Sequence, residues 1–363
     1  MRFAGRFVVA LVLWYALALQ VLAGPATLDQ NELRALRELV ARDPAAGKQF
    51  QEVRKAADAA LGGKPQPVER IVSEGELESN PKKVQSTAAL KDVDKVEALA
   101  WTWAVTGDER YALKGRQYID AWAKVNKSDG NPINETKLEP MIEAYDLLRD
   151  SFSAADRARI DLWLNDRAMT LWNDPRVRRE NWQSHRLKIV GLIGATTGSD
   201  PIWGIADKGF REQIRVNFDD GGESVDFKRR DALHYHIYAV QPLLTLACVA
   251  QHKGDRFFDY VAGNGASLRE AVEFVEPFAT GKKKHLEFAE SEVEFDRKRA
   301  AAGEKGYTEK YWSPKSSVRL FAEAGCIDPA YDKLAVKLEG GSAGSGYARW
   351  RSVLNAAGAN RSR

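Results

Sequence analysis

The sequence predicts an all-α protein, and three observations lead to this fold class. Apolar residues recur at helical spacing through most of the 363-residue chain. Sustained alternation of apolar and polar residues, which marks a half-buried strand, is nearly absent. The predicted helices are about 12 to 20 residues long and are joined by short turns, which favours antiparallel helical hairpins. Repetition of such hairpins around one axis would give a toroid or an open solenoid.

The first 23 residues are set apart from the rest of the chain. Arg2 and Arg6 make the start basic, residues 7–19 are almost wholly apolar, and small residues precede a cleavage point after Ala23. This pattern is typical of a secretory signal peptide, with an uncleaved inner-membrane anchor as the alternative. No other stretch approaches the ~20 apolar residues that a membrane span needs. We therefore expect a single domain over residues 24–363, periplasmic or secreted, with no membrane contact after cleavage.

Ten stretches of the mature chain carry a helical apolar stripe. We expect helices over 33–41, 50–61, 93–105, 110–125, 137–149, 154–171, 182–196, 203–216, 230–252 and 257–275. Residues 64–86 form a long polar segment with three prolines and no apolar stripe. Loops of this length inside a compact domain are often functional lids, and disorder is the alternative. Residues 282–306 are charged and weakly amphipathic, and residues 340–346 resemble a flexible linker.

Charge and cysteine content exclude several classes of protein. Without Arg2 and Arg6, 52 basic and 51 acidic residues remain. No basic stripe dominates a face, so we expect no nucleic-acid partner. Local basic clusters suit an acidic small or polymeric ligand better. The two cysteines make no disulfide framework: Cys248 lies on an apolar helix face and is expected to be a buried free thiol, although an oxidising compartment would permit a bridge to Cys326.

The stretch of residues 219–250 carries more candidate chemistry than any other part of the chain. A glycine-containing acidic turn leads into a basic triplet, and an aromatic and histidine cluster and then an apolar helical stripe follow. If a helix begins by Lys228, the side chains of Lys228, Asp231 and Tyr235 share one face. Arg229 could meet Tyr235 only from the preceding turn. A cation there would bind a carboxylate and make the phenolate more accessible; the alternative is a solvated basic turn in front of core aromatics.

His234 and His236 raise the question of a metal site. Residues two apart on a helix point about 200° away from each other, so one ion cannot easily bind both rings. The sequence holds no H-E-x-x-H or C-x-x-C motif that would complete a site. It also lacks a Gly-rich nucleotide fingerprint, and no serine sits in a Gly-x-Ser-x-Gly elbow between a predicted strand and a helix. We therefore expect neither a metal nor another cofactor.

A second candidate site spans residues 180–186. Asn181 and His185 are four residues apart and hence neighbours on a helix face, with Trp182 and Gln183 at the same helix entrance. An amide, a histidine and an aromatic ring there can bind a carboxylate and polarise a neighbouring proton. The alternative makes Asn181 a helix cap, Trp182 a core residue and His185 a surface histidine.

A third candidate is the polar loop of residues 131–136. Its polar side chains, Asn134 and Glu135 among them, could line a sugar subsite, although capping is the commoner role. Further along, Glu139 and Glu143 share a helix face and could suggest the paired carboxylates of a hydrolase. Carboxylates one helical turn apart are usually solvated, which makes this the weaker interpretation.

Several of these stretches together resemble the alginate-lyase-type polysaccharide lyases. The run 103–112 followed by 120–122 looks like a helical hairpin of that family, and 230–243 is similar to its most distinctive helix. The resemblance covers most of residues 90–251. It implies an incomplete α/α toroid that cleaves a uronic-acid polymer, such as alginate or glucuronan, by β-elimination.

The resemblance also implies roles for individual residues. Asn181 matches the asparagine that neutralises the substrate carboxylate, and Tyr235 matches the catalytic tyrosine. Two positions depart from the family: its histidine is replaced by Trp182, which leaves His185 as a substitute one turn on, and its arginine falls on Lys228. We expect catalysis by Tyr235, Asn181, Arg229 and His185, and substrate binding by Lys228, Arg230, His234, Trp182, Gln183, Asn134 and Glu135.

Three functions are compatible with these residues. In β-elimination, an amide and a cation offset the substrate carboxylate, and one tyrosine can take H5 and protonate O4. The alternatives are an α/α-barrel glycoside hydrolase, which needs two carboxylates across a cleft, and a non-catalytic polysaccharide-binding or secretion protein. The preferred interpretation is a monomeric lyase whose partner is an anionic polysaccharide.

Overall fold

The structure is a computed structural model that describes residues 26–341 and 346–359. Its longer helices are α1 (Gln30–Arg42), α2 (Pro44–Leu61), α3 (Pro81–Ala89), α4 (Lys91–Thr106), α5 (Glu109–Val125), α7 (Glu139–Leu148), α8 (Ala154–Asn173), α9 (Glu180–Thr197), α10 (Asp200–Asn217), α12 (Leu233–His252), α17 (Pro329–Leu338) and α18 (Trp350–Gly358).

Shorter elements connect them. The short α-helices are α6 (Pro132–Glu135), α11 (Val225–Arg230), α13 (Leu268–Glu273), α14 (Glu276–Ala279), α15 (Glu294–Ala301) and α16 (Val318–Ala324). Single 3₁₀ turns lie at Thr136–Leu138, Arg149–Ser151, Phe257–Asp259, Lys305–Tyr307 and Pro314–Ser317. The strands of the described residues are β1 (Leu286–Glu287) and β2 (Lys310–Tyr311), which pair antiparallel. The all-α prediction is confirmed.

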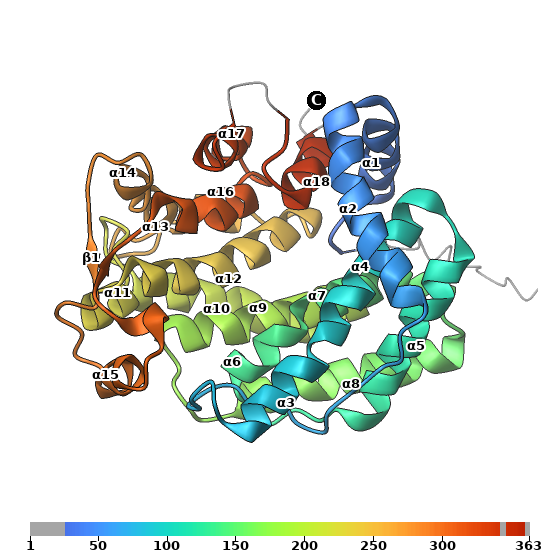
Figure 1. The fold of residues 1–363 in the computed structure, drawn as a ribbon, viewed down its shortest axis with the longest axis horizontal. Helices are drawn as coiled ribbons and strands as arrows, with labels where there is room; N and C mark the ends of the chain where they lie inside the picture. Colours follow the sequence, from blue (N-terminus) through green and yellow to red (C-terminus); the bar gives the residue numbers. More distant parts are fainter. Residues whose placement is uncertain (1–25, 342–345, 360–363) are drawn as a thin grey trace, which may run out of the picture.

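The helices pack in a continuous circuit around the molecule. Contacts lead from α2 to α4, then through α7, α9, α12, α16 and α18, and back to α1 and α2. A second set, α5, α8 and α10, packs against α4 and α9. Figure 1 shows α9, α10 and α12 running side by side across the middle of the molecule. This arrangement is the α/α toroid that the sequence resemblance implies.

Two glycines on α9 permit this close packing of helices. A Cβ on Gly191 would lie 2.2 Å from the Cδ1 atom of Leu246 on α12, and a Cβ on Gly194 would lie 2.7 Å from the backbone nitrogen of Trp203 on α10. Any larger side chain at these positions would push the neighbouring helices away. These contacts fix the C-terminal half of α9, and the second candidate site lies at the N-terminal end of the same helix.

Helix ends follow the local sequence. Asp29 and Glu32 form a capping box at the start of α1, and Ser153 caps α8 as its position before that helix predicts. Gly107 and Gly198 end α4 and α9 in the left-handed conformation, with φ of 70° at both residues. These breaks turn the chain back on itself and make the helical hairpins.

Three of the predicted segments differ from the structure. The helix expected over 230–252 begins only at Leu233, because the chain breaks at Asp231. The helix expected over 257–275 is reduced to a 3₁₀ turn, a loop and α13, because its apolar residues fill core positions without a helical backbone. The polar segment 64–86 contains the start of α3 and buries Ile71, so it is partly packed.

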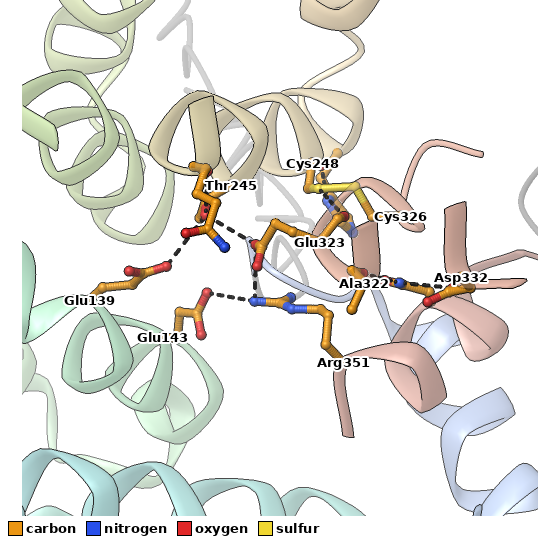
Figure 2. Close-up of a disulfide and its surroundings, with 12 residues drawn as sticks. Glu139, Glu143, Thr245, Cys248, Ala322, Glu323, Cys326, Asp332 and Arg351 are labelled. Carbon is orange, nitrogen blue, oxygen red and sulfur yellow. Dashed lines mark hydrogen bonds and ion pairs between the residues drawn. A yellow bond between two sulfur atoms is a disulfide. The ribbon is translucent and has the colours of Figure 1, made fainter. Parts of the chain in front are cut away.

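The two cysteines form a disulfide, so the expectation of a free thiol at Cys248 is wrong. The bridge joins Cys248 on α12 to Cys326 just after α16 across a sequence separation of 78 residues, and the two Cα atoms lie 6.0 Å apart (Figure 2). Spacing along the sequence cannot show that these two positions meet in space. The bridge fastens the C-terminal helices to the circuit.

None of the helices in the described residues is both long and apolar enough to cross a membrane. The expected signal peptide, residues 1–23, lies outside the described residues, as do residues 342–345 of the linker-like run.

Candidate active site

A cleft of about 400 Å³ opens where α9, α11 and α12 begin. Six of its lining residues are sequence-predicted site residues: Asn181, Trp182, Arg229, Arg230, His234 and Tyr235. The others include Ser73, Glu74 and Lys83 from the 64–86 segment, Lys137, Tyr238 on α12, and Arg299 and Tyr307 from the C-terminal part. Segments far apart in the sequence therefore meet around one polar cleft.

Tyr235 lies at the centre of the aromatic and cationic groups of this cleft. It sits in the first turn of α12 and is 5% exposed. The guanidinium carbon of Arg230 lies 3.6 Å from the centre of its ring, and the ring of Phe288 meets it edge-on. Burial raises the pKa of the Tyr235 hydroxyl above its ordinary range, and the Arg230 cation acts in the opposite direction.

The backbone break at Asp231 decides which cation reaches Tyr235. Asp231 ends α11 in the left-handed conformation, with φ of 49°, so α11 and α12 are separate helices. Lys228 therefore does not share a face with Tyr235; its Nζ pairs with an Asp219 carboxylate oxygen at 2.6 Å, and it does not line the cleft. The structure therefore does not bring Lys228 to the cleft, where it was expected to bind substrate. Arg230, next to the break, takes the place beside the ring.

The two arginines of the triplet have different partners. Arg229 donates from Nη1 to Glu180 at 2.7 Å and remains partly exposed at the cleft. Arg230 is mostly buried and pairs with Asp296 at 3.0 Å. A guanidinium has five N–H donors, so Arg229 keeps donors for a ligand carboxylate. Arg230 is better placed to act on Tyr235.

Asn181 lies in the first turn of α9 and is 5% exposed. Its backbone N–H donates to Asp226 at 3.0 Å, and its side-chain amide donates to the same carboxylate oxygen. Arg179, and not Asn181, is the residue before the helix, so the capping alternative is wrong. One of the two amide hydrogens is left for a ligand. Burial raises the pKa of Asp226 to about 6, although the hydrogen bonds from Asn181 act to lower it.

His185 and Gln183 lie behind the cleft wall. His185 is 4% exposed, its Nδ1 atom hydrogen-bonds with the Thr136 hydroxyl at 2.8 Å, and its ring packs on Tyr238. Burial and the nearby Lys188 hold the pKa of His185 well below its ordinary value, so the ring is neutral. Gln183 is buried and accepts from Arg186. The expected roles of both residues toward substrate are not supported, because neither side chain lines the cleft.

Trp182 and His234 do line the cleft, as expected. Burial, with Lys310 and Arg230 close by, lowers the pKa of His234 to about 4, so that this ring is neutral at pH 7. His236 is buried and hydrogen-bonds with Ser224 and the carbonyl of Ala271. The described residues contain no group of three or more His, Cys, Asp or Glu side chains placed to hold a metal ion.

Asn134 and Glu135 hold other parts of the protein and do not line the cleft. The side-chain oxygen of Asn134 accepts from the backbone N–H groups of Ser73 and Glu74, each at 3.0 Å, and from the Ser73 hydroxyl. Glu135 is buried in an ion pair with Arg167. The structure therefore does not bring these two side chains to the cleft, where they were expected to bind sugar: Asn134 fastens the 64–86 segment, and Glu135 is paired with Arg167.

Lys137 is a site residue that the sequence reading missed. It lines the cleft, and within the described residues it has neither an ion-pair nor a hydrogen-bond partner. Desolvation in the cleft and the neighbouring cations Lys188, Lys83 and Arg319 lower its pKa. A lysine directly after a predicted loop gives no sequence signal of its own; only its neighbours in space reveal it.

Backbone strain gathers around the cleft. Among the described residues, the non-glycine residues with positive φ are Glu180 (63°), Asp231 (49°) and Phe288 (63°). Glu180 holds Arg229, Asp231 separates α11 from α12, and Phe288 packs on Tyr235. Residues in this conformation cost of order 1–3 kcal/mol each and concentrate at functional sites. Their positions around the cleft support its assignment as the functional site.

Comparisons with known proteins agree on one family. The family model described as alginate lyase matches residues 37–285. A polysaccharide lyase from Stenotrophomonas maltophilia (strain K279a) is 29% identical over 184 residues, which are 47% of this chain and 55% of that protein. The chain thus matches little more than half the length of this curated relative.

Solved structures show the same fold. An alginate lyase from Bacteroides ovatus superposes with a TM-score of 0.69 at 15% identity, over 92% of this chain and 99% of that one. Alginate lyase A1-III from Sphingomonas species A1 gives 0.59 at 20% identity, over 85% and 90%. A variant of A1-III complexed with tetrasaccharide gives 0.59 at 19% identity, over 83% and 87%. Because the family model spans well over half of the chain, this protein belongs to the alginate lyase family.

Proposed function

We propose that the protein is a polysaccharide lyase that cleaves an alginate-type uronic-acid polymer by β-elimination. The observation that carries the proposal is the meeting of Tyr235, Asn181 and the cations Arg229 and Lys137 in one cleft. The curated relative is named a polysaccharide lyase, and several similar structures are named alginate lyases, one of them complexed with a tetrasaccharide.

The substrate carboxylate must first be neutralised. The hydrogen on C5 is very weakly acidic until the neighbouring carboxylate charge is offset, since an enolate-like charge develops there. Three hydrogen-bond donors line the cleft without being fully engaged: Arg229, Lys137 and the free amide hydrogen of Asn181. In the proposed complex they surround the carboxylate of the sugar that is cleaved.

Tyr235 then moves the proton. Its phenolate oxygen takes the proton from C5, the electron pair forms the C4–C5 double bond, and the bond from C4 to O4 breaks. The same hydroxyl returns the proton to O4, so Tyr235 ends in its starting state. Arg230, at 3.6 Å from the ring, favours the phenolate that burial alone would disfavour.

We propose that the 64–86 segment acts as a lid over the cleft. Ser73, Glu74 and Lys83 line the cleft, and Asn134 fixes the backbone at residues 73 and 74. Closure over the polymer would exclude water and strengthen the interactions with the carboxylate. We further propose that the mature protein is a monomer in the periplasm or secreted, which the Cys248–Cys326 bridge supports because disulfides persist in oxidising compartments.

The test is the chemical nature of the product. The mature protein is incubated with polymannuronate, polyguluronate, glucuronan and pectate, and the ultraviolet absorbance of a conjugated double bond is followed. A lyase produces one such bond for every cleavage. New reducing ends without absorbance would indicate a hydrolase, and binding without new ends would indicate a polysaccharide-binding protein.

A further inference from the structure

One wall of the cleft is built by residues 286–311, beyond the residues 37–285 that match the family. We call residues 286–311 the closing wall. It is fastened where α11 meets α12: the backbone N–H of Phe288 donates to the carbonyl of Asp231 at 2.7 Å, and Arg230 pairs with Asp296 at 3.0 Å. Its geometry relative to Tyr235 is therefore set by several contacts.

The closing wall places Tyr307 beside Tyr235. Tyr307 packs against the small cluster that contains Tyr235 and Phe288, and both tyrosines line the cleft. Arg299 is 6% exposed and donates from Nη1 to the Tyr307 oxygen at 2.7 Å. The Arg299 guanidinium also lies over the Tyr307 ring, 4.6 Å from its centre. Tyr307 thus joins a buried cation to the cluster that holds the proposed catalytic tyrosine.

A hydrogen bond between the two hydroxyls would act on Tyr235 according to its direction. If Tyr235 donated to Tyr307, the bond would stabilise the neutral form of Tyr235 and raise its pKa. A phenol has one hydrogen to donate. Because Arg299 already donates to the Tyr307 oxygen, the hydrogen of Tyr307 is free to point toward Tyr235. A phenolate at Tyr235 accepts it as a charge-assisted hydrogen bond.

We propose that Tyr307, oriented by Arg299, is a positioning residue that holds the Tyr235 oxygen and stabilises its phenolate by donating a hydrogen bond. This inference rests on the proposed β-elimination. Tyr307 keeps its own proton throughout: the proton from C5 still passes only to Tyr235 and from there to O4. Tyr307 therefore increases the fraction of Tyr235 that is deprotonated and able to act as the base.

A shared carboxylate links this pair to the 64–86 segment. One carboxylate oxygen of Glu304 accepts a hydrogen bond from the backbone N–H of Glu78 at 3.1 Å. Its other carboxylate oxygen lies 3.7 Å from the Nε atom of Arg299. The 64–86 segment and Arg299 thus hold the same side chain from two sides. Docking of that segment on the closing wall restricts Arg299, and through it Tyr307.

The experiment compares Tyr307→Phe with the unchanged protein. The pH profile of kcat/KM is measured on the uronan that gives unsaturated product. Loss of one hydrogen bond to a charged group should move the rising, acidic limb upward by about one pH unit. Activity should fall roughly 10-fold where the base is mostly protonated and recover as the pH rises. Arg299→Lys, which keeps the charge but loses the planar fork, should shift the limb in the same direction by less.

The matched control is Tyr311→Phe. Tyr311 belongs to the same closing wall but is 70% exposed and does not line the cleft, so its profile should not move. A Tyr307→Phe profile that superimposes on the unchanged one, shifts to lower pH, or is lowered equally at every pH would overturn the proposal.

A second readout needs no substrate. In protein labelled with ¹³C at the tyrosine ζ carbon, the Tyr235 resonance is identified by its loss in Tyr235→Phe. Its titration should move to higher pH in Tyr307→Phe, and an unmoved titration would overturn the proposal even if no polymer were cleaved. Failure of the unchanged protein to form a double bond would contradict the proposed function instead, so the two failures are distinct.

Discussion

Two polar clusters on the helical circuit differ in how their charges are balanced. In the cleft, Lys137 has no ion-pair partner among the described residues, and Arg229 is only partly engaged. A second cavity, of about 330 Å³, is lined from α4, α7, α16 and α18 by what we call the acidic cluster: Glu97, Glu139, Glu143 and Glu323.

The acidic cluster neutralises its charge from within. Arg351 lies 3.5 Å from both Glu143 and Glu323, and Lys188 pairs with Glu139 (Figure 2 shows the first three). Burial raises the pKa of Glu97 to about 7 and that of Glu143 to about 8, with Arg351 opposing both shifts. The carboxylates of the acidic cluster are paired with cations or protonated. The cleft, in contrast, has hydrogen-bond donors available for a ligand. This difference separates a structural network from a binding site.

The comparison also bears on the hydrolase alternative. A glycosidase needs two carboxylates that flank the substrate with room for a sugar bond between them. Glu139 and Glu143 instead lie on one helix, and each has a cation partner within the protein. Their geometry favours an internal role.

The largest expected difference between the two clusters is catalytic. Tyr235→Phe should abolish turnover while binding is largely kept, because only the proton transfer in the transition state is lost. Glu143→Gln, in the acidic cluster, should leave kcat near that of the unchanged protein. Product formation and a separate binding measurement, such as calorimetry with an oligosaccharide, check both. Unchanged kcat in Tyr235→Phe would remove Tyr235 from the mechanism.

Asn181→Ala should have the next largest effect. Loss of a preorganised donor to a developing charge lowers kcat by about 10²-fold or more. The variant also frees Asp226, so its thermal unfolding is recorded beside its kinetics, with activity expressed per folded molecule. Equal activity per folded molecule would mean that Asn181 serves only to hold Asp226.

A smaller effect, on KM, should separate free cations from paired ones. Lys137→Gln should raise KM for the uronan severalfold, because Lys137 lines the cleft and pairs with no other side chain of the part of the chain that the structure describes. Lys228→Gln is the control, since Lys228 is paired with Asp219 outside the cleft. The KM of the unchanged protein should also rise from about 20 to 500 mM NaCl as the cations are screened. A flat salt profile would contradict an anionic substrate.

The smallest expected effect concerns stability. The folded protein holds protons on Glu97 and Glu143 that the unfolded chain releases above its ordinary carboxyl pKa, so stability falls as pH rises toward about 8. Glu143→Gln removes part of this dependence. Its melting temperature should match that of the unchanged protein near pH 5 and exceed it by about 3 °C or more at pH 9. Parallel melting curves at all pH values would show that Glu143 is already ionised.

Local sequence predicted the helices and their order well. The expected bounds of α5 and α8 fall within two residues of the observed ones. The turns and caps that set these bounds, such as Ser153, depend on residues that are close in the sequence. The break at Asp231 could not be predicted, because aspartate favours this conformation only weakly and the contacts that enforce it come from residues 285–290.

The site was predicted in part. Tyr235 and Asn181 stand in motifs, so their places in the cleft followed from the resemblance. Tyr307 and Lys137 stand in no motif and reach the cleft only through the tertiary fold. His185 stands one turn further along α9, where it is buried against Tyr238 and does not line the cleft; its sequence spacing alone does not show this.

The bridge between Cys248 and Cys326 makes one covalent ring of the chain between them. The closing wall lies inside that ring, and its exposed tip around residues 302–306 is a natural place for a protease to cut. A single cut there opens the ring without separating the pieces, since the sulfur atoms still join the two fragments. A nicked enzyme would run as one band on a gel without reductant and as two bands with it. The bridge therefore protects the assembly of the site as well as its stability.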